Sequence, residues 1–276
     1  VADLLGADQT DLPRISTFHG LGYGILQDQQ PDTELKFISE ADRVALIRRL
    51  ALSKVFKGRT VRELGQMISK YKGSLRPAED QPVAGLVQSY NNALNGLGLV
   101  DFDDLLSQTY ALLTQDAALR RLLQTRYKYL LIDEFQDTSE LQWATTQQLR
   151  GSDTIFVIGD PLQAIYGFRG ADAEMFERFR EDFPAHQNIS LRINYRSARS
   201  IVMLAGAIFP GSEALEPATA EEGCVQALQT LNEYSEADLV LGTIEQGIGG
   251  SDLLKAHVES KGLRFKDFAV LYRTHR

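Results

Sequence analysis

Cysteine and long apolar runs are scarce in this 276-residue sequence, and each shortage excludes a class of protein. The single cysteine, Cys224, excludes a disulfide framework and a cysteine-based zinc site within the chain. The longest apolar stretch, Ile201–Phe209, is far shorter than the roughly 18 residues that a membrane-spanning helix needs. The chain also begins at Val1, with neither an initiator methionine nor a signal peptide. These shortages favour a reducing, cytoplasmic setting.

Positive charge is also in short supply, but it is unevenly spread. The formal net charge is −8, which by itself argues against nucleic acid as a partner. The segment Lys36–Arg76 contains eleven basic and three acidic residues, so it carries +8 and the rest of the chain carries −16. This asymmetry predicts an anion-binding subdomain within an acidic body, although a solvated helical face is the simpler explanation of a charge run alone.

Strand-like and helical patterns alternate along the chain, which predicts an α/β body with parallel strands. Strands are expected at Arg14–Phe18, Tyr129–Ile132, Thr154–Ile158, Ile189–Ile193, Val225–Leu228 and Phe268–Tyr272. Several are continuous apolar runs, as expected where both faces of a sheet are covered. Helices are expected at Asp103–Leu113, Glu140–Leu149, Ala173–Phe183, Ser197–Ile208 and Tyr234–Gln246.

Two features of the sequence divide this body. Residues 35–98 read as all-helical, beginning with a periodic apolar pattern over Glu40–Phe56, so we expect a helical insertion there. The pair Phe183-Pro184 predicts a boundary between two α/β lobes.

The strongest chemical signal is an apolar strand that ends in two adjacent carboxylates, Asp133 and Glu134. Ligands bind at the carboxyl ends of parallel strands. Mg²⁺ carried by a nucleoside triphosphate needs one or two carboxylates, and the second carboxylate can deprotonate an attacking water. The alternative is an exposed Asp-Glu pair that opens a helix and interacts with its dipole.

Two further strands end in polar and aromatic clusters. The strand Ile155–Ile158 precedes Gln163, and Tyr166, Phe168 and Arg169 follow within a few positions. Flat rings beside a guanidinium suit stacking on unpaired bases, although isolated rings are more often part of a core. The third strand ends in the run Asn194-Tyr195-Arg196-Ser197.

These three blocks resemble motifs II, III and IV of the UvrD/Rep/PcrA group of superfamily 1A DNA helicases. Ser16–Gly20 resembles the Thr-Phe-His motif of this family, and Val100–Leu106 resembles the segment that follows its helical subdomain 1B. Phe268–Thr274 resembles the strand of motif IVa. In this order the matches cover nearly the whole chain.

The resemblance implies a role for each matching residue. Asp133 is expected to hold Mg²⁺, with Glu134 beside it to activate the hydrolytic water. Gln163 is expected to sense the γ-phosphate of ATP, Arg196 to reach it as an arginine finger, and Tyr195 to stack on the adenine. The expected single-strand path comprises Thr17, Phe18, His19, Tyr166, Phe168 and Arg169.

The resemblance also implies RecA-like P-loop NTPase lobes, each a parallel sheet with flanking helices, with an inserted all-helical subdomain. Residues 1–34 and 99–184 are then parts of lobe 1A, residues 35–98 form DNA-binding subdomain 1B, and residues 185–276 are part of lobe 2A. The expected activity is 3′→5′ DNA unwinding and translocation driven by hydrolysis of Mg-ATP, in DNA repair or replication restart. The expected partners are single-stranded DNA, single-strand/duplex junctions and repair or replication proteins, with no membrane.

One element of such a motor is missing. None of the 22 glycines is followed by lysine, so the chain has no Gly-x-x-x-x-Gly-Lys-[Ser/Thr] loop to hold phosphates. We therefore expect a middle fragment, with that loop before Val1 and motifs V and VI after Arg276, that is inactive alone. Two alternatives stay open: the helicase part of a RecB/AddA-like helicase–nuclease, and a non-catalytic DNA-binding regulator.

Overall fold

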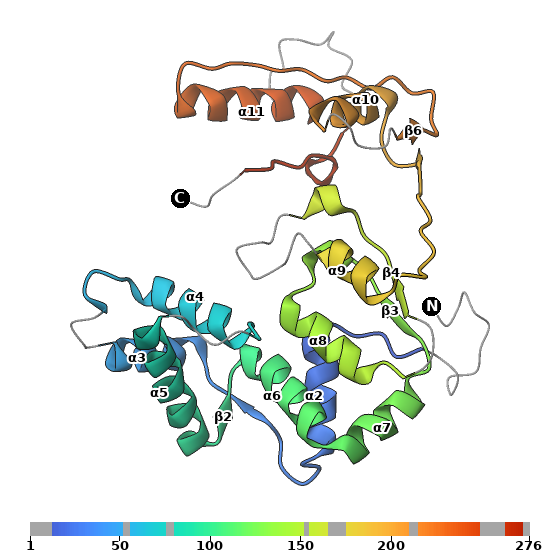
Figure 1. Ribbon diagram of the computed structural model, residues 1–276. Helices are drawn as coiled ribbons and strands as arrows, with labels where there is room; N and C mark the ends of the chain where they lie inside the picture. Colours follow the sequence, from blue (N-terminus) through green and yellow to red (C-terminus); the bar gives the residue numbers. More distant parts are fainter. Residues whose placement is uncertain are drawn as a thin grey trace. The chain divides into compact units, whose positions relative to one another are not determined.

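The computed structural model describes residues 13–51, 56–75, 80–151, 155–164, 175–209, 215–248 and 263–272 (Figure 1). Contacts divide the chain into two compact units, residues 1–186 and 187–276. Helices make up most of the regular structure in the described residues of both units, and the strands form three parallel pairs. The expectation of parallel strands in an α/β chain is confirmed for these pairs.

The first unit contains most of the regular structure. Its helices are α2 (Phe18–Asp28), α3 (Glu40–Leu50), α4 (Val61–Lys72), α5 (Gln81–Leu97), α6 (Phe102–Gln115), α7 (Ala117–Arg126), α8 (Glu140–Leu149) and α9 (Met175–Asp182). Its strands are β1 (Lys36–Phe37), β2 (Leu99–Val100), β3 (Leu130–Ile132) and β4 (Ile155–Val157). Side-chain caps begin several helices, as at Ser139, where a capping box with Gln142 opens α8.

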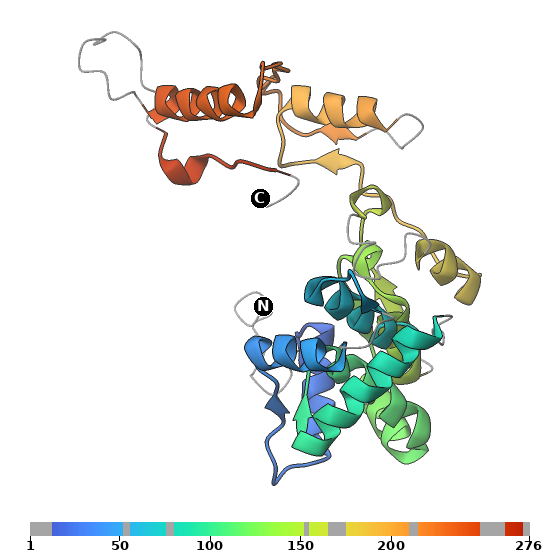
Figure 2. The same ribbon diagram turned by 90° about the vertical axis from the view of Figure 1, so that its left-hand side faces the viewer.

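Helices α3, α4 and α5 pack around a core of their own (blue to teal in Figure 2). Its most buried side chains include Ile47, Ile68 and Tyr90, one from each helix. The strands on either side of this helical segment, β1 before it and β2 after it, pair in parallel with Phe37 opposite Val100. The chain therefore leaves for the three helices and returns from them at neighbouring positions.

Helix α6 packs against both α2 and α8, and its crossing with α2 is unusually close. A Cβ atom at Gly22 would lie 2.5 Å from the backbone oxygen of Leu105 and 3.0 Å from Thr109 Oγ1. Only glycine permits this approach of two helix backbones. Helix α2 is thereby held against the first turns of α6.

The segment Arg14–Phe18, expected as a strand, is not one. Residues 14–17 are irregular and Phe18 begins α2, with Thr17 as its N-cap. The Thr17 hydroxyl accepts a hydrogen bond from the Gly20 N–H at 3.1 Å, which satisfies a free donor of the first helical turn. The capping hydroxyl outweighs the β preference of the apolar residues before it.

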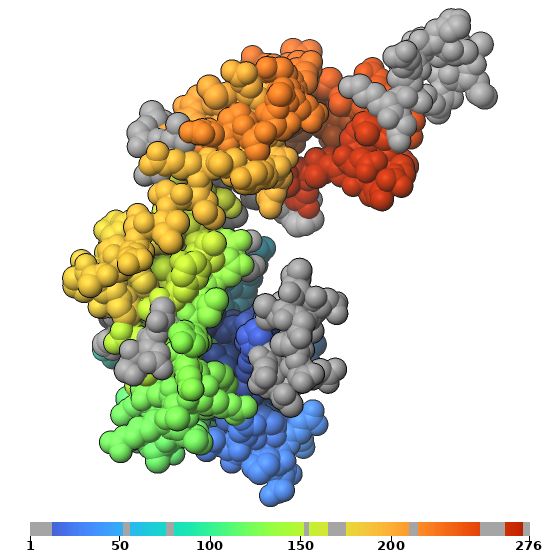
Figure 3. Space-filling model, turned by 90° about the vertical axis from the view of Figure 1, so that its right-hand side faces the viewer, coloured from blue at the N-terminus to red at the C-terminus, as the bar shows by residue number. Residues whose placement is uncertain are grey.

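The pair β3–β4 is covered on one face only, within the described part of the chain. Ile132, Ile155 and Val157 pack with Phe135, Trp143 and α9 in a single core, and Figure 3 shows the yellow residues of α9 against the green ones before them. Leu131 and Phe156, paired across the ladder, are 73% and 49% exposed. The expectation that both faces are covered is wrong here, because the described helices pack only on the Ile132 face.

The second unit contains β5 (Ile193–Asn194), α10 (Arg199–Ile208), β6 (Glu216–Pro217) and α11 (Glu233–Ile248). Val202 is its only buried apolar residue among those described. Two expected strands, Val225–Leu228 and Phe268–Tyr272, form no β-ladder in the described structure, and of the expected strand Ile189–Ile193 only Ile193 lies in a strand, β5. An apolar pattern favours a strand, but it does not determine which neighbour the strand pairs with or in which register.

No helix within the described ranges is long and apolar enough to cross a membrane.

Candidate functional site

The acidic pair follows β3 as a sharp, exposed turn. Ile132 is buried at the end of the strand, whereas Asp133 and Glu134 are both exposed. Glu134 has φ of 50°, the left-handed region that residues other than glycine seldom occupy. Its N–H donates to Asp133 Oδ1 at 3.0 Å, so the first carboxylate fixes the backbone of the second.

The residue after this pair anchors the turn. Phe135 is fully buried, and its ring meets those of Trp143 and Phe176 edge to face, with centroids 5.3 and 5.2 Å away. Its N–H donates to the Ile158 oxygen at 2.9 Å, where β4 ends. Such aromatic pairs stabilise a core beyond their buried area, so the two carboxylates stand on a rigid base.

Gln136 connects the acidic turn to the turn after β4. Its side-chain Nε2 donates to Glu134 Oε2 at 2.6 Å, and its Oε1 accepts from the Asp160 N–H at 3.0 Å. The Gln136 side chain is buried, at 3% exposure. Gln136 is not among the site residues predicted from the sequence, although its place inside the run Asp133–Asp137 was a signal.

The turn after β4 brings Gln163 into the same network. Asp160 Oδ2 accepts from Gln163 Nε2 at 2.9 Å, and Asp160 Oδ1 accepts from the Leu162 N–H at 3.0 Å. Glu134 and Gln163 are therefore joined through Gln136 and Asp160. Asp160, like Gln136, is a residue of this site that was not predicted from the sequence.

The donor set suits Mg²⁺ bound through a nucleotide. No group of three or more potential ligand side chains gathers around one point in the described residues. Mg²⁺ retains several waters and binds one or two carboxylates together with substrate phosphates, so the exposed Asp133 with Glu134 beside it is sufficient. The residues present fit that role.

Tyr195 and Arg196 lie in the second unit, directly after β5, and both are exposed. The Asn194 side-chain oxygen accepts from the backbone N–H groups of Arg196 and Ser197, at 3.0 and 2.9 Å. This turn presents the tyrosine ring and the guanidinium outwards. Their expected approach to the nucleotide in the first unit stays a prediction.

The Thr-Phe-His run occupies the start of α2. Thr17 caps the helix, and Phe18 is half-buried against the core of Phe135 and Trp143. His19 is half-buried, and burial lowers the pKa of its imidazole, with the Asp103 carboxylate opposing that shift. The imidazole therefore favours its neutral form more than an exposed histidine does.

His19 borders a cluster of aromatic rings that the sequence analysis missed. The His19 ring lies edge-on to Phe102 at 6.3 Å, Phe102 lies 5.3 Å from Phe37, and Phe37 stacks on Tyr23 at 6.2 Å. Phe102 is 68% exposed. The spacing of His19 and Tyr23, one turn apart on a helix, was a signal, but their neighbours come from β1 and α6. Tyr166, Phe168 and Arg169 lie outside the described residues.

Not all of the basic segment is available to a ligand. The Lys72 side chain is buried, and its Nζ lies 2.7 Å from Asp101 and 2.8 Å from Asp104. Arg43 is half-buried and donates to the Gly65 oxygen and the Ser69 hydroxyl. The exposed basic residues among those described are Lys36, Arg48, Arg49, Lys57, Arg59, Arg62 and Lys70.

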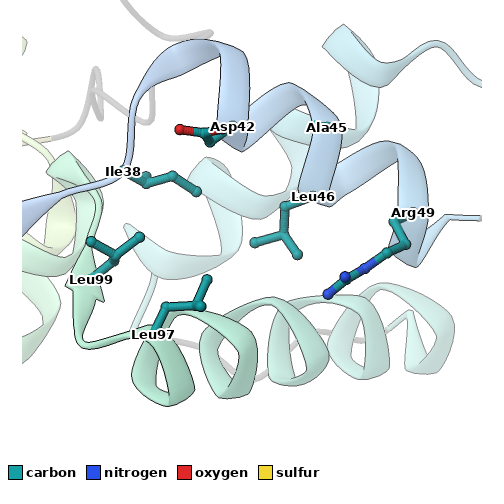
Figure 4. Close-up of a pocket in the computed structure, with 7 residues that line it drawn as sticks. All are labelled: Ile38, Asp42, Ala45, Leu46, Arg49, Leu97 and Leu99. Atoms are coloured by element: carbon teal, nitrogen blue, oxygen red, sulfur yellow. The ribbon is translucent and has the colours of Figure 1, made fainter.

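A pocket of about 420 Å³ lies between α3 and the end of α5 (Figure 4). Its walls are mainly apolar, from Ile38, Leu46, Leu97 and Leu99. Asp42 and Arg49 supply its only charged side chains. It contains none of the residues of the acidic turn, so it does not form part of the candidate site.

Comparisons with known proteins point in one direction. Residues 1–184 match the UvrD/REP helicase N-terminal domain. All of the chain aligns at 28% identity with 42% of the ATP-dependent DNA helicase Rep of Buchnera aphidicola subsp. Baizongia pistaciae. It also aligns in full at 29% identity with 39% of the DNA helicase II of Escherichia coli K12. The E. coli K12 ATP-dependent DNA helicase Rep is 30% identical over 99% of the chain, which covers 42% of that protein. The chain thus spans about two fifths of the length of these relatives.

Proposed function

This chain belongs to the UvrD/REP helicase N-terminal domain family, and we propose that it supplies the hydrolytic and strand-binding residues of an ATP-dependent 3′→5′ DNA helicase. The observation that carries the proposal is the hydrogen-bonded connection from Glu134 through Gln136 and Asp160 to Gln163. It joins the residues expected to activate water and to sense the γ-phosphate. The RecA-like α/β fold follows from the family, and the relatives named above are DNA helicases.

In this proposal, Asp133 holds Mg²⁺ and Glu134 acts on the attacking water. When bound, Mg²⁺ neutralises charge on the β- and γ-phosphates. The water oxygen bonds to the γ-phosphorus, the bond from that phosphorus to the β–γ bridging oxygen breaks, and its electron pair leaves with ADP. The water proton passes to the Glu134 carboxylate. Gln163 contacts the γ-phosphate, Arg196 stabilises its developing charge, and Tyr195 stacks on the adenine.

The proposed path for single-stranded DNA begins at Thr17 and His19. The rings of Phe102, Phe37 and Tyr23 continue from His19, and flat exposed rings accept bases of any sequence. Phe18 packs in the core, which makes it a support for this path rather than its surface. Tyr166, Phe168 and Arg169 complete the path in this proposal.

Residues 35–98, which contain β1 and the helices α3, α4 and α5, are the proposed subdomain 1B, and their exposed basic residues are proposed to contact duplex DNA at a junction. Seven exposed cations between residues 36 and 70 suit a phosphate backbone, whose binding releases counterions. We propose that the longer protein acts in DNA repair or replication restart, with repair or replication proteins as partners.

A non-catalytic DNA-binding regulator is the second candidate. Such a protein would keep the fold without a phosphate-binding loop of the Gly-x-x-x-x-Gly-Lys type. Both candidates predict DNA binding by this chain. Only the helicase predicts that a longer protein with this segment and such a loop hydrolyses ATP.

Two measurements test the proposal. The 276-residue chain alone should show no appreciable ATP hydrolysis, and Glu134-dependent turnover by it would contradict that expectation. A longer protein that combines this segment with a phosphate-binding loop should hydrolyse ATP when single-stranded DNA is added, and Glu134→Gln should abolish this. Persistent absence of hydrolysis in the longer protein, together with retained DNA binding, would support the regulator instead.

A further inference from the structure

Gln136 occupies a position between the two catalytic turns that the proposed roles leave unexplained. Its buried amide contacts Glu134 on one side and the backbone of Asp160 on the other. Building on the proposed function, we propose that Gln136 is a positioning residue that holds the water-activating carboxylate of Glu134 in register with the Asp160–Gln163 turn. A change at the γ-phosphate end then reaches Glu134 through one side chain.

The chemistry of its partners fixes the orientation of the Gln136 amide. A carboxylate oxygen accepts hydrogen bonds, so it faces the NH₂ group, and a backbone N–H donates, so it faces the carbonyl oxygen. Rotating the amide by half a turn would place its carbonyl oxygen against the Glu134 carboxylate, two acceptors, and its NH₂ group against the Asp160 N–H, two donors. Glutamine therefore has one favourable arrangement here. Leucine would leave the Asp160 N–H without this partner, and glutamate would oppose two carboxylates.

The Gln136 amide lies directly against the backbone of Gly159, which leaves no space for a side chain at position 159. A Cβ atom at Gly159 would lie 2.2 Å from Gln136 Oε1 and 2.9 Å from the Phe135 N atom. Any side chain at position 159 would displace the Gln136 amide or the turn that carries Glu134. Gly159 thus permits the contact, and the requirement for glycine does not come from its own φ.

The contact also continues beyond Asp160. The Asp160 carboxylate binds the Leu162 N–H and the Gln163 amide, so the backbone that Gln136 holds is the same turn that presents Gln163. At the other end, Glu134 has a positive φ, and its backbone N–H donates to the Asp133 carboxylate. That hydrogen bond holds the backbone of Glu134, whereas its side-chain carboxylate is held by Gln136. Second-layer partners of this kind orient catalytic groups through their hydrogen bonds.

A purely structural role, in which Gln136 merely fastens two turns together, makes a different prediction. If Gln136 only connects the two turns, its loss should lower the stability of the fold and should affect substrate binding and turnover equally. If Gln136 positions Glu134, its loss should lower kcat, because the attack by the reacting water depends on the orientation of that carboxylate and substrate binding does not. Two measurements distinguish these roles. One compares kcat with KM, and the other measures the stability of the variant in which the amide and the carboxylate at positions 136 and 134 are exchanged.

The first arm measures thermal unfolding of the 276-residue chain. Gln136→Glu should lower Tm by about 4–8 °C, because it opposes carboxylates at positions 134 and 136. In a Glu134→Gln background the same change should lower Tm by less than half as much, because the amide and carboxylate are then exchanged. Equal losses in both backgrounds would overturn the contact.

Gln147 provides a matched control in the same unit. Its Nε2 donates to Asp182 Oδ2 at 2.9 Å, so Gln147→Glu also opposes two carboxylates, but away from the site. Its effect on Tm should be the same with and without Glu134→Gln. If Gln136→Glu prevents folding, hydrogen exchange decides: Gln136→Leu should speed exchange at the Asp160 amide at least tenfold, and Gln147→Glu should not. Unchanged exchange in Gln136→Leu would refute the contact.

The second arm uses the longer protein with a phosphate-binding loop. Gln136→Glu should lower kcat for ATP hydrolysis about tenfold or more and leave KM for ATP within about twofold. Gln147→Glu should change neither, and Glu134→Gln with Gln136→Glu should recover Tm without recovering kcat. An unchanged kcat, or equal changes in kcat and KM, would overturn the positioning role. Absence of hydrolysis in the unmutated protein would refute the proposed function, and with it the role of Glu134 that Gln136 serves.

Discussion

Lys72 in α4 and Asp101 at the start of α6 form a buried ion pair, with 2.7 Å between Nζ and Oδ1. Asp104 Oδ1 also lies 2.8 Å from Lys72 Nζ, and the centroid of the Tyr90 ring lies 5.4 Å from the same nitrogen. Burial opposes ionisation of Asp101, yet the Lys72 ammonium and the Asp104 backbone N–H hold its pKa below its ordinary value. The helical segment and α6 are thus joined by a charge cluster as well as by the chain.

Removing the ammonium should therefore be severe. Lys72→Met leaves two buried carboxylates without a cation, and we expect the free energy of unfolding to fall by about 3–5 kcal/mol. Lys70→Met is the matched control, because Lys70 is exposed two residues away, and it should change stability by less than about 0.5 kcal/mol. Urea unfolding of both variants tests this, and similar losses would contradict it.

The pH dependence of His19 should follow from its surroundings. Burial lowers its pKa below 6.5 and Asp103 opposes the shift, so Asp103→Asn should lower it further. A histidine with a depressed folded pKa binds fewer protons folded than unfolded, so its contribution to stability is full at higher pH and falls as pH drops below 6.5. NMR titration of the His19 ring in both proteins measures this. A rise of the His19 pKa in Asp103→Asn would contradict the expectation that the Asp103 carboxylate stabilises the protonated imidazole.

The α2–α6 crossing should not tolerate a methyl group. Gly22→Ala places its Cβ 2.5 Å from the Leu105 oxygen, and we expect a loss of about 1–3 kcal/mol in the free energy of unfolding. Gly85→Ala in α5 is the control, since no atom lies within 4 Å of its Cβ position. It should stabilise the chain by about 0.5–1 kcal/mol through helix propensity. Denaturant titrations of both should move in opposite directions.

The aromatic cluster should contribute to binding of single-stranded DNA. Phe102→Ala should weaken binding of an unpaired oligothymidine by about 5-fold or more, since stacking on one base stabilises binding by about 1–3 kcal/mol. The salt dependence should be unchanged, because no cation is removed. Tyr129→Ala, equally exposed at 68%, should have no effect. Fluorescence anisotropy across a salt series measures this, and equal weakening by both variants would refute it.

Much of the local structure could be predicted from the sequence where local signals decide it. Helix α8 spans Glu140–Leu149 as predicted, because Ser139 and Gln142 form a capping box at its start. The strand β3 and the exposed Asp133-Glu134 turn were also predicted, since an apolar run ends abruptly in two carboxylates. Where a residue pattern leaves pairing undetermined, as at Val225–Leu228, the predicted strand is wrong.

The hydrogen-bonded core of the site could not be predicted in the same way. Gln136 lies two residues after Glu134 in sequence, but its second partner is the Asp160 backbone 24 residues later. That contact depends on the register of β3 against β4 and on the missing side chain at Gly159. Local patterns contain neither. The same holds for Phe37 and Phe102, which come together only because β1 pairs with β2 next to α6.

The two-residue ladder between β1 and β2 makes the helical segment modular. Paired strands lie about 4.8 Å apart, so the positions of Phe37 and Val100 fix the gap that any intervening chain must close, whatever its length. Loop closure depends only weakly on loop length, so we expect the connections between these helices to tolerate changes in length without moving β1 or β2. The sites that such changes must keep are on α4, where Lys72 pairs with Asp101 and Asp104 and the Ser69 hydroxyl donates to Asp103 at 2.6 Å.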